Sequence, residues 1–76
     1  MWEEKNNTLS KEFKFVSFVN ALAFVNAIGV LAEEMQHHPD ILLYNYNHIR
    51  ITLNTHNAGI VTDKDRALAQ KIDEII

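Results

Sequence analysis

Two segments of the chain alternate apolar and polar residues, which is the pattern of a β-strand with one buried face. In residues 9–15 every odd position is apolar except Lys11. The second segment, residues 48–55, alternates more regularly, with apolar residues at every second position: Ile49, Ile51 and Leu53. We therefore predict a strand in each segment.

Turn-forming residues precede both strands, which predicts that each strand belongs to a hairpin. Asn6 and Asn7 separate the first strand from a short strand that begins near Trp2. Asn45–Asn47 separate the second strand from a short apolar run at Ile41–Tyr44.

Between the two hairpins the apolar residues follow helical spacing, and Ser17 is placed to cap the helix. They form two adjoining stripes, Phe18, Leu22, Val25, Ala32 and Met35 beside Ala21, Phe24, Ile28 and Leu31. Because this sector is too wide for one buried face, we expect the helix to pack on the sheet and also on a partner chain. Pro39 predicts the end of the helix, which leaves His37 and His38 at or just beyond its C-terminus.

A second helix is predicted near the end of the chain, with Thr62 as its N-cap and Asp63 and Asp65 in its first turn. Its apolar stripe consists of Leu68, Ala69, Ile72, Ile75 and Ile76. The resulting order is β-β-α-β-β-α. It predicts one α+β domain over residues 1–76, with a four-stranded antiparallel sheet and both helices on one face.

Composition narrows the classes of function. A chain of 76 residues buries only roughly 60% of its unfolded surface, and without cysteine it has no disulfide to stabilise it, so we expect its stability to come from very regular packing or from oligomerisation. The net charge is −3 and the basic residues are dispersed, which argues against direct nucleic-acid binding. The longest apolar stretch, residues 21–32, is shorter than the about 20 residues of a membrane span. No signal peptide is evident, so we expect a cytoplasmic protein.

The candidate chemistry lies at the ends of predicted elements. Polar and titratable residues gather after the first helix and after the last strand: Glu33, His37, His38, Thr55, His56 and Asp65. Histidine exchanges protons near neutral pH, and a carboxylate can orient an imidazole. The set could therefore perform acid–base elimination of water.

Simpler interpretations of the same residues stay open at this point. His37 and His38 could be favourable cations at a helix C-terminus, and Asp65 could serve only in a capping box with Thr62. His48 is expected on the surface of its strand. A metal site is disfavoured, because adjacent helical residues point about 100° apart and no HxH or HxxxH pair is present.

These residues also resemble a known family, the pterin-4a-carbinolamine dehydratases. The resemblance rests on HHPDI at 37–41, THNAG at 55–59 and TDKD at 62–65, and it extends upstream through FKFVSFVNALAFVNAIGVLAEEMQ. Two departures stand out. Ser17 occupies a position where the family often has Asp, and Ile60 replaces the second glycine of an A-G-G run. Since glycine tolerates positive φ and isoleucine does not, Ile60 raises the question of whether the loop after His56 keeps its conformation.

The resemblance implies a dehydratase that converts a 4a-hydroxytetrahydropterin to a quinonoid dihydropterin and water. It implies dimers or tetramers and no metal or cofactor. His37 and His56 would transfer protons, His38 would line the pocket, Asp65 would orient a histidine and Glu33 would give secondary support. The remaining residues expected near the substrate, by family position, are Gln36, Asn54, Thr55 and Asn57.

The resemblance leaves two alternatives to catalysis. Some family members serve as dimerisation cofactors of a transcription factor, and an apolar central helix and sheet edges would suit a protein partner. Alternatively, Ile60 could mark a degenerate protein that binds pterin without turnover.

Overall fold

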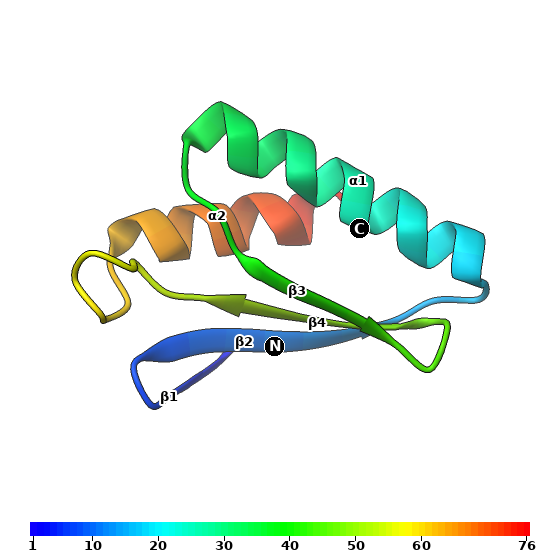
Figure 1. Ribbon diagram of the computed structural model, residues 1–76, viewed down its shortest axis with the longest axis horizontal. Coiled ribbons are helices and arrows are strands. Elements are labelled where there is room, and N and C mark those ends of the chain that lie inside the picture. Colours follow the sequence, from blue (N-terminus) through cyan, green and yellow to red (C-terminus); the bar gives the residue numbers. More distant parts are fainter.

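In the computed structural model, residues 1–76 form a four-stranded antiparallel sheet with two helices packed on one face (Figure 1). The elements in chain order are β1 (Glu3–Lys5), β2 (Thr8–Lys14), α1 (Phe18–Met35), β3 (Asp40–Tyr44), β4 (His48–Leu53) and α2 (Asp63–Glu74). The strands lie side by side in the order β1-β2-β4-β3. The predicted α+β fold is confirmed, including its β-β-α-β-β-α order.

The two strands with the clearest alternation, β2 and β4, occupy the centre of the sheet. They pair antiparallel from Leu9 opposite Leu53 to Lys14 opposite His48. Both hairpin turns contain residues with positive φ, 54° and 62° at Asn6 and Asn7 and 48° and 56° at Asn45 and Tyr46. Three of these four residues are asparagines, which tolerate this left-handed conformation better than most residues, and this explains why the predicted turns form there.

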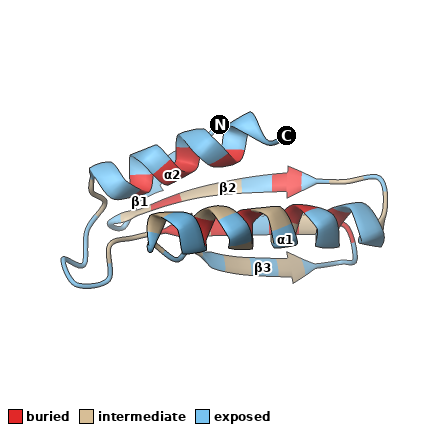
Figure 2. Cartoon of the chain, turned by 90° about the horizontal axis from the view of Figure 1, so that it is seen from above, coloured by how far each residue is buried: buried red, intermediate tan, exposed pale blue.

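The core lies between the sheet and the helices (Figure 2). Its members are the inward-facing residues of β2 and β4 and one stripe from each helix: Leu9, Phe13, Ala21, Phe24, Ile28, Ile49, Ile51, Leu53, Leu68, Ala69 and Ile72. The predicted stripe of α2 extends too far, because Ile75 and Ile76 follow the helix and are exposed.

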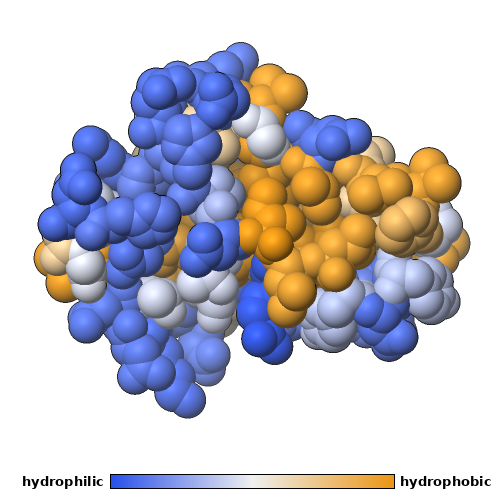
Figure 3. Space-filling view, in the orientation of Figure 1, coloured by the Kyte–Doolittle hydropathy of each residue, from blue (hydrophilic) through white to orange (hydrophobic).

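The two predicted stripes of α1 have different environments. Ala21, Phe24 and Ile28 of the second stripe are buried against the sheet. In the first stripe Ala32 is also buried, but Phe18 and Leu22 keep 47% and 39% of their surface exposed. These two residues, with Val19 and Val30, are the exposed apolar face of α1. On the face shown in Figure 3, apolar side chains gather at the centre and right, and polar side chains cover most of the left.

By length and hydropathy alone, α1 would also qualify as a membrane-spanning helix, with 18 residues and a mean hydropathy of 1.4. A core helix can pass the same test. Here α1 contributes to the hydrophobic core along one stripe, as a core helix does.

Candidate functional site

The end of α1 places His37. The sequence suggested that the helix could extend as far as His38, the residue before Pro39. The helix ends three residues earlier, at Met35, because Gln36 adopts a left-handed conformation with φ 50° and ψ 42°. The His37 N–H then donates to the Ala32 carbonyl at 3.1 Å, as in a Schellman motif. This reversal turns His37 toward the N-terminus of α2.

There the His37 ring meets Asp65. The His37 Nε2 atom lies 2.5 Å from Asp65 Oδ1, and the carboxylate is fully buried while the His37 side chain is 10% exposed. An ionised carboxylate only accepts hydrogen bonds, so His37 must carry a proton on Nε2. Its Nδ1 atom is therefore the nitrogen left for proton exchange.

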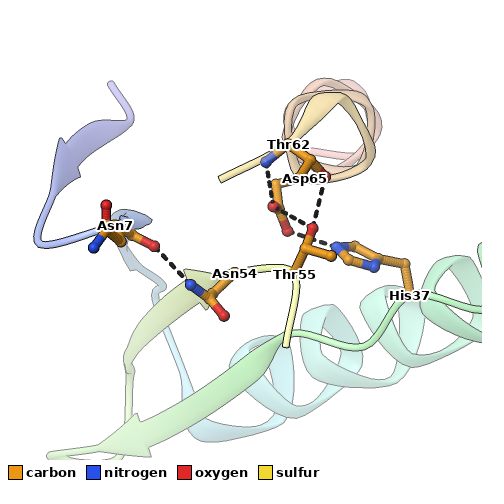
Figure 4. A network of polar contacts seen from close by, with 6 residues as sticks. All are labelled: Asn7, His37, Asn54, Thr55, Thr62 and Asp65. Carbon is orange, nitrogen blue, oxygen red and sulfur yellow. Dashed lines mark hydrogen bonds and ion pairs between the residues drawn. The ribbon is translucent and has the colours of Figure 1, made fainter. Parts of the chain in front are cut away.

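The second oxygen of Asp65 is held by threonines (Figure 4). Asp65 Oδ2 accepts from the Thr62 N–H at 2.9 Å and from the Thr55 hydroxyl at 2.8 Å. The Thr62 and Thr55 hydroxyl oxygens are 2.6 Å apart. Since the single Thr55 proton goes to Asp65, Thr62 donates to Thr55. Asp65 thus accepts from the backbone N–H of the N-cap residue Thr62 and also pairs with His37, so its contacts extend beyond a capping box.

The Asp65 network favours the ionised carboxylate. Burial alone would raise the pKa of the Asp65 carboxyl, but the hydrogen bonds from His37, the Thr62 N–H and Thr55 together lower the pKa below its ordinary value of 3.8. The resemblance implied that Asp65 orients a histidine without indicating which one. Its hydrogen bonds go to His37 and the two threonines.

His38 forms a looser pair with Glu33. Its Nε2 atom lies 2.5 Å from Glu33 Oε2, and the two side chains are 55% and 71% exposed. Exposed pairs of this kind contribute little and orient weakly. The two adjacent histidines are therefore unequal, with His37 held rigidly and His38 held loosely.

A pocket of about 220 Å³ opens beside these pairs. It has no hydrophobic lining residue, and its wall is formed by Gln36, His37, His38, Asn54, Thr55, His56, Asn57 and Lys64. The end of α1 and the segment after β4 thus contribute three histidines to one pocket. The Asn54 amide donates to the Asn7 carbonyl at 2.7 Å, which ties this wall to the β1–β2 turn (Figure 4).

Lys64 is the pocket residue that the sequence analysis missed. It stands inside the TDKD block, immediately before Asp65, so its place in that block was the available signal. A larger hollow of about 690 Å³ lies on the sheet face opposite the helices, but it contains no histidine. No group of three His, Cys, Asp or Glu side chains is arranged to hold a metal ion.

The loop after His56 keeps a defined conformation with isoleucine at position 60. Ile60 has no positive φ and instead pairs with Thr55, whose N–H donates to the Ile60 carbonyl at 3.0 Å. The left-handed residue is Gly59, with φ 70°. Isoleucine at position 60 is therefore compatible with the loop.

Replacing Gly59 by alanine is expected to lower the free energy of unfolding by about 1 kcal/mol, because alanine disfavours positive φ. Gly29→Ala is the matched control, since Gly29 lies within α1 and a Cβ there meets nothing within 4 Å. That variant should gain about 0.5–1 kcal/mol. Urea denaturation measures both, and equal effects would contradict the positive φ at Gly59.

The domain is thus a small α+β protein with a histidine-lined pocket, a class equipped for proton transfer to a small polar ligand. The family model described as pterin 4 alpha carbinolamine dehydratase matches residues 1–75. The chain belongs to this family, as its HHPD and THNAG motifs suggested.

Relatives and solved structures agree with this assignment. A Sulfolobus acidocaldarius protein is 47% identical over 97% of this chain and 80% of its own length, and one from Chloroflexus aurantiacus is 47% identical over 99% and 80%. Both carry the name "Putative pterin-4-alpha-carbinolamine dehydratase".

Two solved structures share the fold. A transcriptional coactivator/pterin dehydratase from Brucella melitensis has a TM-score of 0.90 and 32% identity over 97% of this chain and 80% of its own. A pterin dehydratase-like protein, identified as a RuBisCO assembly factor in the alpha-carboxysome, has a TM-score of 0.77 and 29% identity over 97% and 84%. Proteins that share this fold therefore carry names that describe functions other than dehydration.

Proposed function

We propose that this protein dehydrates a 4a-hydroxytetrahydropterin to a quinonoid dihydropterin and water. The observation that carries the proposal is the His37–Asp65 pair, in which a buried carboxylate fixes one imidazole nitrogen and leaves the other for catalysis. His56 lines the same pocket from a different part of the chain, and it supplies the second proton-transfer group. This is the minimum equipment for an acid–base elimination.

The reaction needs two proton transfers and no electrons from outside. One histidine donates a proton to the hydroxyl on C4a, and the C4a–O bond breaks as water leaves. The N5 lone pair forms the C4a=N5 bond, and the other histidine removes the proton from N5. The sum of these steps is substrate to dihydropterin and water, with the histidines exchanging protons with solvent between turnovers.

The rest of the wall is proposed to bind the substrate. Pterin carries an amide-like edge of N–H donors and a carbonyl acceptor, which side-chain amides can match. We assign this binding role to Gln36, Asn54, Thr55 and Asn57, together with His38 and its supporting Glu33. His38 is assigned to binding because its exposed pair with Glu33 holds it loosely.

Stopped-flow dehydration of synthetic 4a-hydroxytetrahydropterin, together with equilibrium binding of a stable pterin, tests this function. A catalysed rate above the spontaneous one supports the enzyme. Binding without acceleration indicates a degenerate pterin-binding protein. If neither is seen, the dehydratase proposal is wrong, and a role in protein association becomes the better account.

Protein association is the second candidate function, and the exposed apolar face of α1 favours it. The names of the two structural neighbours also describe roles other than dehydration, one as a transcriptional coactivator and one as a RuBisCO assembly factor. Between Phe18 and Ala32 the helix has no charged residue, so two copies can meet there without repulsion. We therefore propose that a second copy of this chain covers the face, giving a homodimer or homotetramer. The cytoplasmic location expected from the sequence stays a prediction.

Leu22→Glu is expected to disrupt this oligomer, because it would bury a charge at the centre of an apolar contact. Sedimentation should show the wild type at a multiple of 8.8 kDa and the variant at the monomer mass. Gln70→Glu, on the exposed side of α2, adds the same charge and should leave the assembly unchanged. A wild type that stays monomeric at micromolar concentration would rule out the proposed assembly.

A further inference from the structure

The charge on the pocket wall differs from that of the rest of the chain. The protein has ten acidic and seven basic residues, but the pocket lining contains a lysine, three histidines and no carboxylate. Asp65 and Glu33 pair with His37 and His38 and are not part of the lining. A ligand in this pocket therefore meets hydrogen-bond donors and the positive charge of the lysine.

The fixed charge belongs to Lys64, which the proposed acid–base reaction does not use. Lys64 is exposed and takes part in none of the five ion pairs of the structure. Of the lining residues, His37, Asn54 and Thr55 are partly buried, whereas Lys64, like His56, belongs with the exposed residues that form the rim. Its ammonium is therefore available to the part of a ligand that leaves the pocket.

If the proposed function is correct, pterin chemistry identifies the part of the ligand that leaves the pocket. The reacting N5 atom is bonded to C6, the carbon that carries the variable side chain of natural pterins. With the ring held at His37 and His56, a substituent on C6 begins one bond from the reacting atoms and extends toward the rim. Lys64, His37 and His56 all line this one pocket, so a ring held by the two histidines has its C6 substituent in the pocket that Lys64 also lines.

We propose that Lys64 makes this pocket selective for pterins with an anionic substituent on C6 over pterins with a neutral one. A lysine ammonium has three donors and no acceptor, and it binds phosphate or carboxylate as a point charge. The favoured substrate is accordingly a carbinolamine whose side chain is a phosphate ester or carries a carboxylate.

Fluorescence titration with three stable pterins tests the selectivity without requiring turnover. The probes are 6-hydroxymethylpterin, its phosphate ester and 6-carboxypterin. At low salt the wild type should bind the phosphate ester about twofold to fivefold more tightly than the alcohol, the range for an exposed charge pair. Equal preference for the carboxylate would show that any anion suffices, and preference for the phosphate alone would restrict the site to phosphate esters.

Lys64→Gln should bring the ratio of the dissociation constants of 6-hydroxymethylpterin and its phosphate ester close to one. Lys64→Glu should invert this ratio. Lys71→Gln removes the same charge from the last turn of α2, outside the pocket, and should keep the wild-type ratio. Raising the salt from 0.01 M to 1 M shortens the Debye length from about 30 Å to about 3 Å, so the preference should shrink.

A wild-type ratio of one, or a ratio that Lys64→Gln leaves unchanged, would overturn the proposal. An equal loss of affinity for all three pterins in Lys64→Gln would also overturn it, because Lys64 would then contact the ring. The proposed dehydration is judged separately by turnover. If the anion preference persists in a protein without turnover, the Lys64 proposal stands and the enzymatic proposal fails.

Discussion

Replacing His37 or His56 by alanine is expected to lower kcat for 4a-hydroxytetrahydropterin by at least about tenfold, and by up to about 10⁴-fold. Each variant removes one of the two proton-transfer groups and leaves the pocket otherwise lined as before. His37→Ala should have the larger effect, because the wild-type ring is pre-oriented by a buried carboxylate. The measurement is stopped-flow dehydration under multiple-turnover conditions at saturating substrate.

His48→Gln is the matched control for both histidine variants. His48 belongs to β4 and packs beside Tyr44, with the two ring centroids 5.2 Å apart, outside the pocket lining. It should keep the wild-type rate. Full activity in both His37→Ala and His56→Ala would remove the catalytic assignment, and an equal loss in His48→Gln would mean that folding, not proton transfer, had been affected.

Substitutions of Asp65 are expected to have the second large effect. Two of them separate its role in orienting His37 from its role in accepting hydrogen bonds from the two threonines. Asp65→Asn can keep an oxygen facing the Thr55 hydroxyl and the Thr62 N–H, but it then presents an NH₂ donor to His37. His37 would have to accept on Nε2 and carry its proton on Nδ1, the reverse of the wild-type arrangement. We expect kcat to fall at least tenfold with a loss of only about 1–2 kcal/mol in stability.

Asp65→Ala removes every acceptor and leaves the Thr62 N–H and the Thr55 hydroxyl without their partner. We expect a loss of about 2–4 kcal/mol in the free energy of unfolding, measured by urea denaturation. If Asp65→Asn and Asp65→Ala were equally destabilising and the asparagine variant stayed fully active, the carboxylate would be only a helix cap.

The lowered pKa of Asp65 also sets a pH dependence of stability. A carboxyl whose pKa is depressed by folding stabilises the protein above its ordinary pKa of 3.8, and this contribution is lost as the pH falls through that value and below. The wild type should therefore lose stability in acid below about pH 4 more steeply than Asp65→Asn, which cannot ionise. Parallel acid transitions would contradict the depressed pKa.

The strands and the two helix N-termini followed directly from sequence pattern. Alternation is strong in β4 because one face of this central strand is buried, and Ser17 and Thr62 are caps with local signals. The end of α1 was less predictable. Gln36 adopts a left-handed conformation usually taken by glycine, and a glutamine in the sequence does not predict it. That reversal is what turns His37 toward Asp65.

The composition of the site was also predictable in part. The HHPD and THNAG motifs indicated which histidines share a pocket, since they lie at the ends of α1 and β4. They did not show which histidine Asp65 would hold, because that depends on how α2 packs against the end of α1. Lys64 was missed for the same reason, since a lysine in the first turn of a helix has no local pattern that points into a pocket.

The most direct test of the proposed dehydratase activity compares the wild type with the double variant His37→Ala/His56→Ala in stopped-flow dehydration of 4a-hydroxytetrahydropterin. Binding of a stable pterin is measured in parallel to show that the pocket is intact. We predict a wild-type rate well above the spontaneous rate and a double-variant rate that returns to it while pterin still binds. A wild-type rate equal to the spontaneous one, or a double variant as fast as the wild type, would contradict acid–base catalysis by these two histidines.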